Sequence, residues 1–144
     1  MKKVQTGQVI EFYSNTCLVK TSFGEFSCVA IKNVVVGDHV ELEIIQDSKK
    51  TLGKILKVID RRSKISKRIG NKDKLFAANV THVGILVTPS PKTSSEFIDK
   101  WIIKSKASKI SPFIINNKTD IESSLEYDKK LEIYSNIGLK VISI

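Results

Sequence analysis

The sequence of 144 residues contains few residues that bind metals or form disulfides. Its two cysteines, Cys17 and Cys28, form no C-x-x-C pair, and neither has a histidine close by in the sequence. We expect both to be reduced side chains that pack within strands. The two histidines, His39 and His82, are isolated, so a structural or surface role is favoured over a metal ligand for each. No metal site is therefore predicted.

Long apolar segments are also absent from the sequence. No apolar run approaches the length of about 20 residues that crosses a bilayer, so no transmembrane helix is predicted. The first residues, 1–7, lack the apolar region of a signal peptide, and we expect a cytoplasmic protein. Hydrophobic residues make up 41% of the chain, enough for a core, and the length is typical of one domain or two small ones.

Positive charge is concentrated in one stretch of the chain. The formal net charge is +9, and the segment 49–74 holds eleven basic and two acidic residues, a difference that equals the whole excess. Clustered basic residues are typical of a surface that binds phosphate backbones. A solvated linker in a lysine-rich chain is the alternative. The predicted RNA contacts are Lys54, Lys57, Arg61, Arg62, Lys64, Lys67 and Arg68.

The first part of the chain, 1–66, has the pattern of an all-β domain. Turn residues separate five short stretches of alternating apolar residues, which predict strands. Five short strands indicate a small closed barrel of OB or SH3-like size. Gly7 and Gly53 fall inside strand patterns and are predicted bulge or bend sites. The five predicted strands are 4–13, 16–21, 25–30, 34–45 and 52–62.

Four aromatic residues of the barrel are candidates for stacking on RNA bases. They are Phe12, Tyr13, Phe23 and Phe26. Aromatic side chains stack on the bases of single-stranded nucleic acids, but small barrels also use them in their cores. We expect most of the four to lie in the core.

A basic linker is predicted over 67–75, followed by a partial α/β domain over 76–144. Helix-period segments alternate with apolar strands in the order β-α-β-α-β, which predicts a parallel sheet. Capping-box spacing at Thr93 with Glu96 and at Ser123 with Glu126 predicts the two helix starts. Gly138 is the predicted cap at the end of the second helix. The strands are predicted at 78–90, 110–116 and 139–144.

Three strands and two helices make about half of a doubly wound domain. Parallel sheets normally have both faces covered. The last strand, 139–144, is therefore expected to be an unprotected apolar edge, and we expect poor solubility or self-association of the isolated chain.

The second strand of this domain is followed by Asn117-Lys118-Thr119-Asp120. Ligands of open α/β sheets bind beyond the carboxyl ends of the strands. The Asp120 carboxylate would accept two hydrogen bonds from the N1–H and N2–H₂ edge of guanine. Asn117 would donate to the acceptor edge of the base, and the Lys118 stem would lie over its face. The alternative is a polar turn with Asp120 near a helix N-terminus.

The motifs of the barrel resemble those of a known family. "TGQVIEFYSNTCLVKT", "VVVGDHVEL" and "GKILKVIDRRSKISKR" are similar to the first barrel hairpin, the V-x-G-D-x-V element and the G-x-I-x-x-I-x-x-R-x-S-x-L-x-R stretch of the ribosome-small-subunit-dependent GTPase A family (RsgA, also called YjeQ). Ile65 stands in place of the leucine of that last stretch.

The second half resembles the same family in the same order. "AANVTHVGILVT" is similar to A-N-v-D-x-v-x-I-V, with Thr81 where aspartate is common. "FIDKWIIKSKASKISPFIINNKTDI" is similar to l-I-D-R-Y-L…P-x-I-V-L-N-K-x-D-L, with Trp101 in place of tyrosine. The resemblance implies a circularly permuted P-loop GTPase domain, in which the N-K-x-D loop precedes the phosphate loop.

The resemblance also implies function. It implies binding and hydrolysis of GTP with Mg²⁺, rRNA binding through an OB-like barrel, and a role in late maturation of the small ribosomal subunit. It further implies a zinc-binding C-terminal domain, which is not expected within this sequence. Asn117, Lys118 and Asp120 are the matching guanine-binding positions.

The sequence contains no G-x-x-x-x-G-K-[ST] phosphate loop. Phosphate and Mg²⁺ contacts supply most nucleotide affinity and all the transfer chemistry, so no catalytic residue is assigned and this chain alone is expected to be inactive. The alternative is a non-catalytic RNA- or ribosome-binding module with a vestigial GTPase half. With the resemblance set aside, the residues predict only a two-domain cytosolic protein.

Overall fold

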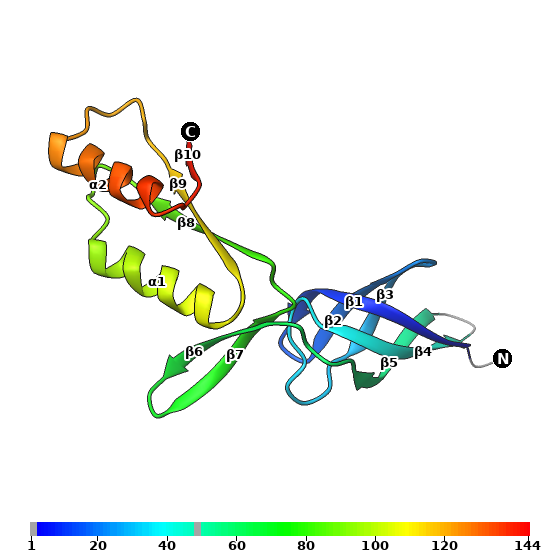
Figure 1. The fold of residues 1–144 in the computed structure, drawn as a ribbon. Helices are drawn as coiled ribbons and strands as arrows, with labels where there is room; N and C mark the ends of the chain where they lie inside the picture. Colours follow the sequence, from blue (N-terminus) through cyan, green and yellow to red (C-terminus); the bar gives the residue numbers. More distant parts are fainter. Residues whose placement is uncertain (1–2, 48–49) are drawn as a thin grey trace. The chain divides into compact units, whose positions relative to one another are not determined.

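The computed structural model describes residues 3–47 and 50–144, and the side chains of 4–45 and 52–144. The chain divides into two compact units, Met1–Val80 and Thr81–Ile144 (Figure 1). The first unit contains the strands β1 to β7, and the second contains the strands β8 to β10 with the helices α1 and α2. Each unit has its own hydrophobic core.

Five strands of the first unit form a closed barrel, as the sequence predicts. They are β1 (Lys3–Tyr13), β2 (Thr16–Thr21), β3 (Gly24–Val29), β4 (His39–Asp47) and β5 (Lys50–Val58). Their order around the barrel is β1-β2-β3-β5-β4, and β4 pairs with β1 to close it. All pairs are antiparallel except β3 with β5.

Gly7 and Gly53 are not the bulge sites of the barrel. The register of β1 with β2 shifts between Val9 and Glu11, and that of β4 with β5 shifts between Glu41 and Leu42. At both glycines, neighbouring atoms occupy the space that a Cβ atom would need: Val19 Cγ1 and the backbone Lys20 O at Gly7, and Cys28 Sγ at Gly53. The glycines therefore permit close packing of strands, and the bulges lie elsewhere.

The barrel core consists of apolar side chains that alternate along the strands. Its largest fully buried members are Leu42, Val9, Val19 and Val40. The two cysteines face each other across β2 and β3 in this core, buried and free, as expected. Burial raises the pKa of the Cys28 thiol to about 11, so this thiol stays protonated at neutral pH.

The residues that the composition predicts as a basic linker form a β-hairpin. Strand β6 (Lys64–Ile69) pairs with β7 (Lys72–Ala78) in an antiparallel two-stranded sheet. The turn between them consists of Gly70 and Asn71, and Gly70 has φ 59°, a conformation that favours glycine. The linker prediction for 67–75 thus gave too much weight to charge, because the apolar alternation of β6 and the two-residue turn favour a hairpin.

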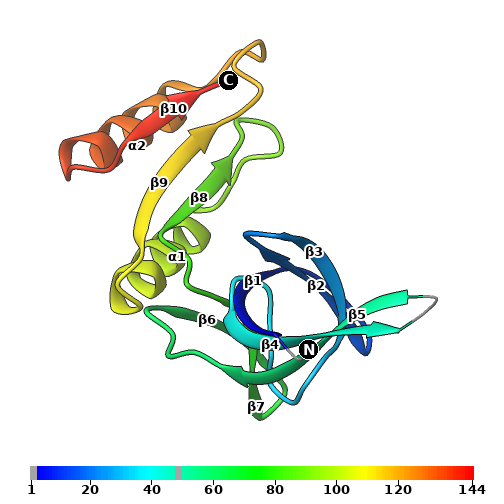
Figure 2. The same cartoon turned by 90° about the vertical axis from the view of Figure 1, so that its right-hand side faces the viewer.

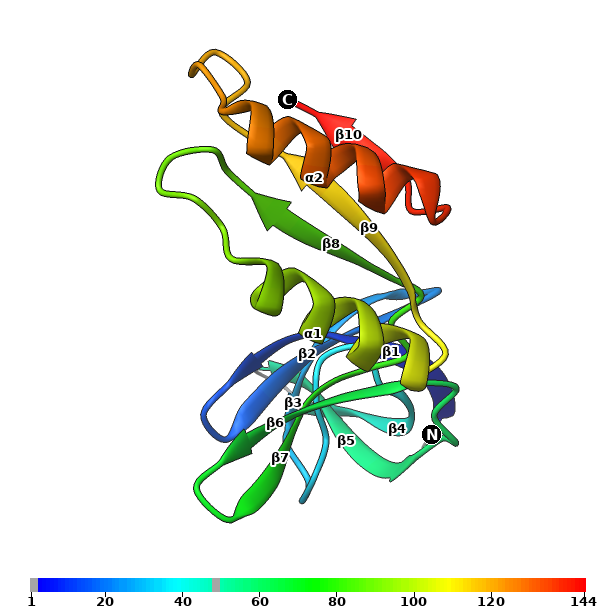
Figure 3. The same ribbon diagram turned by 60° about the vertical axis from the view of Figure 1, so that its left-hand side comes forward.

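Three parallel strands form the sheet of the second unit, in the predicted β-α-β-α-β order. The strands β8 (His82–Val87), β9 (Ser111–Asn116) and β10 (Val141–Ser143) lie in the order β10-β9-β8. The helices α1 (Ser95–Ala107) and α2 (Leu125–Asn136) lie on the same face of this sheet (Figures 2 and 3).

Each helix begins one residue later than the capping-box spacing predicts. Ser94 caps α1 by accepting a hydrogen bond from Phe97 N, and Ser124 caps α2 by accepting one from Tyr127 N. Thr93 Oγ1 instead accepts a hydrogen bond from Thr88 N. In both cases a second hydroxyl follows the predicted cap in the sequence, so spacing alone did not distinguish them.

The end of α2 follows the prediction. The helix ends at Asn136 with Ile137 as its cap. Gly138 follows with φ 87°, and its backbone N–H donates to Ser135 O. Only glycine takes this conformation without strain, so Gly138 stops the helix as predicted.

The core of the second unit lies between the helices and one face of the sheet. Ile85, Val87 and Ile114 of the strands pack there against Ile98 and Ile102 of α1. The opposite face carries Leu86, which is 52% exposed, and no helix of the described residues covers it (Figure 3). No helix of the described residues is long and apolar enough to span a membrane.

Candidate functional site

The predicted guanine-reading loop lies at the carboxyl end of β9. Its first residue, Asn117, donates its backbone N–H to Val87 O, the last residue of β8, at 2.9 Å. The end of β10 is tied to the loop as well, because Ile144 N donates to Asn116 O at 2.8 Å and Thr119 Oγ1 donates to Ile144 O at 3.1 Å. The ends of all three strands therefore hold the loop in place.

Asn117 and Lys118 organise the loop from within. Lys118 has φ 63°, an unusual conformation for a residue with a side chain. Its backbone N–H donates to Asn117 Oδ1 at 2.7 Å, so the Asn117 carbonyl oxygen is engaged by the loop itself. The side-chain amide nitrogen of Asn117 has no hydrogen-bond partner among the described residues, so it is available to donate to a ligand.

The Lys118 ammonium reaches a second loop. Lys118 Nζ donates to Ser90 O at 3.0 Å, in the segment between β8 and α1. The lysine stem is thus extended, and the ammonium keeps a polar partner, as expected for a stem that lies along a flat ligand. This hydrogen bond also connects the loop after β9 with the loop after β8.

Asp120 is exposed, and its side chain has no partner within the described part of the chain. Ile121 N donates to Lys118 O, which places Asp120 inside a turn. The cap of α2 is Ser124, so Asp120 does not begin a helix. Asp120 thus lies in a polar turn between β9 and α2, four residues before the cap of α2, so the alternative of a polar turn near a helix N-terminus stays open.

Sequence reasoning missed Asn116, the residue directly before the loop. The hydroxyl of the buried Tyr127 on α2 donates to Asn116 Oδ1 at 2.6 Å, and burial raises the pKa of Tyr127. The Asn116-Asn117 pair at a strand end was the available signal, because a polar side chain at a strand end needs a partner when it is partly buried.

These contacts leave a defined set of groups for a planar base. An ionised carboxylate accepts hydrogen bonds only, which matches the N1–H and N2–H₂ donors of guanine. Adenine offers no such pair of donors and would leave the Asp120 carboxylate without them. Asn117 Nδ2 supplies a donor for the acceptor edge of the base. The residues present therefore fit guanine, although its binding to this loop stays a prediction.

No metal ion is assigned to these residues. Within the described part of the chain, no three histidine, cysteine, aspartate or glutamate side chains gather into a set of metal ligands. Neither zinc nor Mg²⁺ is therefore assigned a site on these residues, and no chemical step is derived through one.

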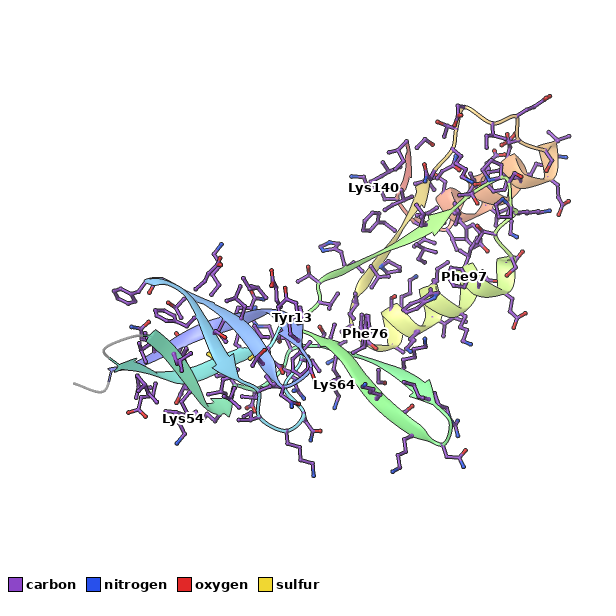
Figure 4. All side chains as sticks on the ribbon, turned by 180° about the vertical axis from the view of Figure 1, so that it is seen from behind. Tyr13, Lys54, Lys64, Phe76, Phe97 and Lys140 are labelled. Carbon is purple, nitrogen blue, oxygen red and sulfur yellow. The ribbon has the colours of Figure 1, made fainter. Side chains whose placement is uncertain are left out.

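Most of the predicted RNA contacts are exposed side chains of the first unit. Lys54 and Lys57 lie on β5, and Lys64, Lys67 and Arg68 lie on the hairpin β6–β7; Figure 4 labels Lys54 and Lys64. Lys57 Nζ lies 3.0 Å from Glu41 Oε1 in an exposed ion pair, which leaves the lysine accessible.

The neighbouring arginines Arg61 and Arg62 differ in their surroundings. Arg61 Nε lies 2.6 Å from Oδ1 of Asp38, which is 0% exposed, and its NH2 group donates to Asp38 Oδ2 and to Asn33 O. The hydrogen bond to Asp38 raises the pKa of Arg61. Arg61 thus pairs with a buried carboxylate of the first unit, and its role in RNA binding stays a prediction. The Arg62 side chain, in contrast, is exposed.

The aromatic residues differ from expectation. Three of the four candidates, Phe12, Tyr13 and Phe23, are 42%, 62% and 65% exposed, so the expectation that most lie in the core is wrong. Phe26 packs against the core. Phe76 on β7, labelled with Tyr13 in Figure 4, is 71% exposed and was missed, because its strand was not predicted and residue 76 was assigned to the α/β domain. The rings of Phe12, Tyr13 and Phe76 are accessible to bases.

Comparison with known proteins identifies relatives of this arrangement. The model of the family described as RsgA GTPase matches residues 58–144. A protein of Paraburkholderia xenovorans named "Small ribosomal subunit biogenesis GTPase RsgA" is 32% identical over 112 residues, which cover 77% of this chain and 34% of the relative. A protein of the same name from Actinobacillus pleuropneumoniae is 30% identical over 99% of this chain and 44% of its own length. The chain thus spans less than half the length of these curated relatives.

Solved structures share the fold. "Crystal structure of YjeQ from Thermotoga maritima" superposes with a TM-score of 0.71 at 22% identity, over 98% of this chain and 51% of that one. "The crystal structure of YloQ, a circularly permuted GTPase" superposes with a TM-score of 0.69 at 19% identity, with the same coverage. The barrel and the partial α/β unit therefore have the fold of circularly permuted GTPases, as the sequence predicts.

Proposed function

The chain belongs to the RsgA GTPase family, and we propose that it supplies the guanine-reading loop and the RNA-binding barrel of a GTPase that acts in late maturation of the small ribosomal subunit. The observation that carries the proposal is the position of Asn117, Lys118 and Asp120. They lie at the carboxyl end of β9, where open α/β sheets bind ligands, and Asp120 is exposed without a partner among the described residues.

The ligand of this loop is the guanine base of GTP or GDP. Asp120 accepts from the donor edge of the base, Asn117 donates to its acceptor edge, and the Lys118 stem lies along its face. Phosphate and Mg²⁺ contacts come from residues outside 1–144, because this sequence has no G-x-x-x-x-G-K-[ST] loop. Zinc, when present in such a protein, is also held elsewhere.

Nucleotide binding by residues 1–144 alone is weak, and we expect no hydrolysis of GTP by them. Base contacts contribute only part of nucleotide affinity, and the transfer chemistry depends on phosphate and metal contacts. Release of phosphate from GTP by the purified chain, at a rate above that of a Lys118→Ala and Asp120→Ala double variant, would contradict this expectation.

The partner of the barrel unit is the RNA of the small ribosomal subunit, in the cytoplasm. Support comes from the exposed cations Lys54, Lys64, Lys67 and Arg68 and from the exposed rings of the same unit. Cations that contact phosphates release counterions, so affinity falls as salt rises. Aromatic rings add contacts that depend little on salt.

Sedimentation with purified small ribosomal subunits tests this part of the proposal. We expect the chain to co-sediment with the subunits at low salt and to dissociate steeply as salt is raised. Arg68→Ala should flatten the salt dependence, whereas Lys140→Ala, which removes the same charge from the second unit, should not. Absence of the chain from the subunit fraction at low salt would refute the RNA-binding role.

A non-catalytic RNA- or ribosome-binding module is the second candidate. The observation that favours it is the absence of a phosphate-loop sequence from these residues. This candidate predicts that RNA affinity is independent of Asp120. Equal subunit binding by the chain and by Asp120→Asn, in the presence and absence of GDP, would favour it over the GTPase reading.

A further inference from the structure

A groove of about 750 Å³ lies on the first unit and brings together residues from several of the motifs quoted above. Its lining comes from strands β1 and β2, from the start of β4 and from the segment 59–62. The groove is lined by Thr6, Gly7, Gln8, Lys20, Thr21, Ser22, His39, Ile59, Asp60, Arg62 and Asn79.

Two exposed cations, Lys20 and Arg62, line the groove. Neither side chain forms a hydrogen bond or ion pair with any residue that the structure describes. This contrasts with Arg61, whose guanidinium is held by Asp38 and Asn33. Of the two adjacent arginines, one therefore stabilises the barrel, and the other has its donors available for a ligand.

The backbone on which Arg62 stands is fixed. Arg62 N donates to Asn79 Oδ1 at 2.9 Å, and Asn79 Nδ2 donates to Gly37 O at 2.9 Å. Gly7, which also lines the groove, leaves no room for a Cβ atom because Val19 Cγ1 and Lys20 O lie where one would be. The cation pair is thus carried by packed strands and a hydrogen-bonded segment, which favours a preformed site.

The lining matches the chemistry of a sugar–phosphate backbone better than that of a base. Its one aromatic ring is that of His39, and it contains no phenylalanine, tyrosine or tryptophan side chain, but it has hydroxyl and amide groups from Thr6, Gln8 and Ser22. One exposed carboxylate, Asp60, also lies in the groove. A carboxylate repels phosphate but accepts a hydrogen bond from a hydroxyl, and the 2′-hydroxyl is the donor that distinguishes RNA from DNA.

We infer that this groove is a binding subsite for the ribose–phosphate backbone of RNA, in which Arg62 and Lys20 bind phosphate and Asp60 accepts from a 2′-hydroxyl. The inference rests on the proposed RNA-binding role of the barrel and gives that role a location. Phosphate contacts position a protein on RNA without reading its sequence. The groove therefore contributes affinity and the choice of RNA over DNA, and the exposed rings of the unit remain for base stacking.

Binding of the full chain to two labelled probes tests the inference: a single-stranded RNA of mixed sequence and the DNA of the same sequence. Arg62→Ala and Lys20→Ala should each weaken RNA binding about twofold to fivefold. Each should also lower the slope of log affinity against log salt by about 0.7. Lys140→Ala, the matched control in the second unit, should leave the slope unchanged.

Asp60→Ala should strengthen binding to DNA, whereas the two cation variants weaken binding to RNA. Removal of the carboxylate should raise DNA affinity, because repulsion of phosphate is lost, and should reduce the preference for RNA over DNA towards one. The matched control is Glu122→Ala, which removes an acid from the second unit. Thermal unfolding of each variant checks that the barrel is intact.

The outcomes separate this inference from the function on which it rests. If the chain binds RNA but Arg62→Ala, Lys20→Ala and Asp60→Ala behave as their controls do, the groove is not the subsite, and the RNA-binding role stands. If the unaltered chain binds neither probe at low salt, the RNA-binding role and the groove fall together. Loss of RNA affinity without loss of the RNA preference in Asp60→Ala would overturn the ribose contact.

Discussion

Replacement of Arg61 by alanine should destabilise the barrel more than any other single loss of a charge on its surface. The Asp38 carboxylate is fully buried and accepts two hydrogen bonds from the Arg61 guanidinium, at 2.6 and 2.8 Å. One further hydrogen bond comes from Val35 N at 2.9 Å. Arg61→Ala leaves a buried negative charge with only the last of these, and breaking such a pair typically costs about 3–5 kcal/mol.

The cost is a large part of the stability of a small domain, which is typically about 5–15 kcal/mol. The two units are expected to unfold separately, so a single global transition would not report the barrel alone. Trp101, the sole tryptophan, lies in the second unit, so its fluorescence does not follow the barrel either. Amide hydrogen exchange of β1 to β5 measures the free energy of opening of the barrel directly.

The matched control is Arg62→Ala, which removes the same charge from the next residue and should change stability by no more than about 0.5 kcal/mol. The double variant Asp38→Ala and Arg61→Ala should lose less than the sum of the single variants, because neither partner remains unpaired. An Arg61→Ala barrel whose exchange differs from the control by less than about 1 kcal/mol would refute the reasoning.

Three further predictions concern packing and titration. Burial and the hydrogen bond to Asp99 raise the pKa of Tyr134 from 10.0 to about 12. The neutral phenol therefore stabilises the second unit below pH 10, and this contribution is lost as the pH rises towards 12. Tyr134→Phe should show a smaller loss of unfolding free energy over that interval. Gly53→Ala should destabilise the barrel by about 1–3 kcal/mol in hydrogen exchange, because the added methyl group meets Cys28 Sγ; exchange equal to that of the unaltered chain would contradict the close approach. Leu86→Lys should reduce self-association measured by sedimentation velocity, since Leu86 lies on the uncovered face of the sheet, and a chain that is monomeric before the substitution would count against this expectation.

The regular elements were predictable because their signals are local. Strand alternation and short turns predict the five strands of the barrel, and the 3.6-residue period predicts both helices. The prediction of a guanine-reading loop rested on Asn117, Lys118 and Asp120 after an apolar strand, and these residues follow the carboxyl end of the central strand β9.

Other features depend on partners that are distant in the sequence. Nothing near Arg61 indicates that its guanidinium pairs with Asp38, so it was grouped with the basic residues that surround it. The Gly37-Asp38 step falls within the predicted strand 34–45, whereas β4 begins only at His39. In the structure Ala78 O occupies the place of a Cβ atom at Gly37, which has φ 90°. The Asp38–Arg61 pair spans 23 residues and the Gly37–Ala78 contact spans about forty, and a local pattern contains neither.

The hairpin β6–β7 shows a different limit. Its turn signal, Gly70-Asn71, was present in the sequence, but five cations in the segment 64–74 favoured a solvated linker. Lysine and arginine lie readily on the exposed face of a two-stranded sheet, because their stems pack while their charges stay in water. Charge therefore distinguished exposed from buried residues, but it did not distinguish a strand from a loop.

The central claim is that the loop 117–120 reads guanine, and nuclear magnetic resonance of the isotope-labelled chain tests it most directly. The amide resonances of Asn117 to Asp120 should shift on addition of GDP and should not shift on addition of ADP. The expected dissociation constant for GDP is in the millimolar range, a binding free energy of about −4 kcal/mol. Asp120→Asn should exchange this preference for xanthosine diphosphate, because the asparagine amide donates to the carbonyl that replaces the amino group of guanine. Amides that respond to neither nucleotide, or equally to GDP and ADP, would contradict the claim.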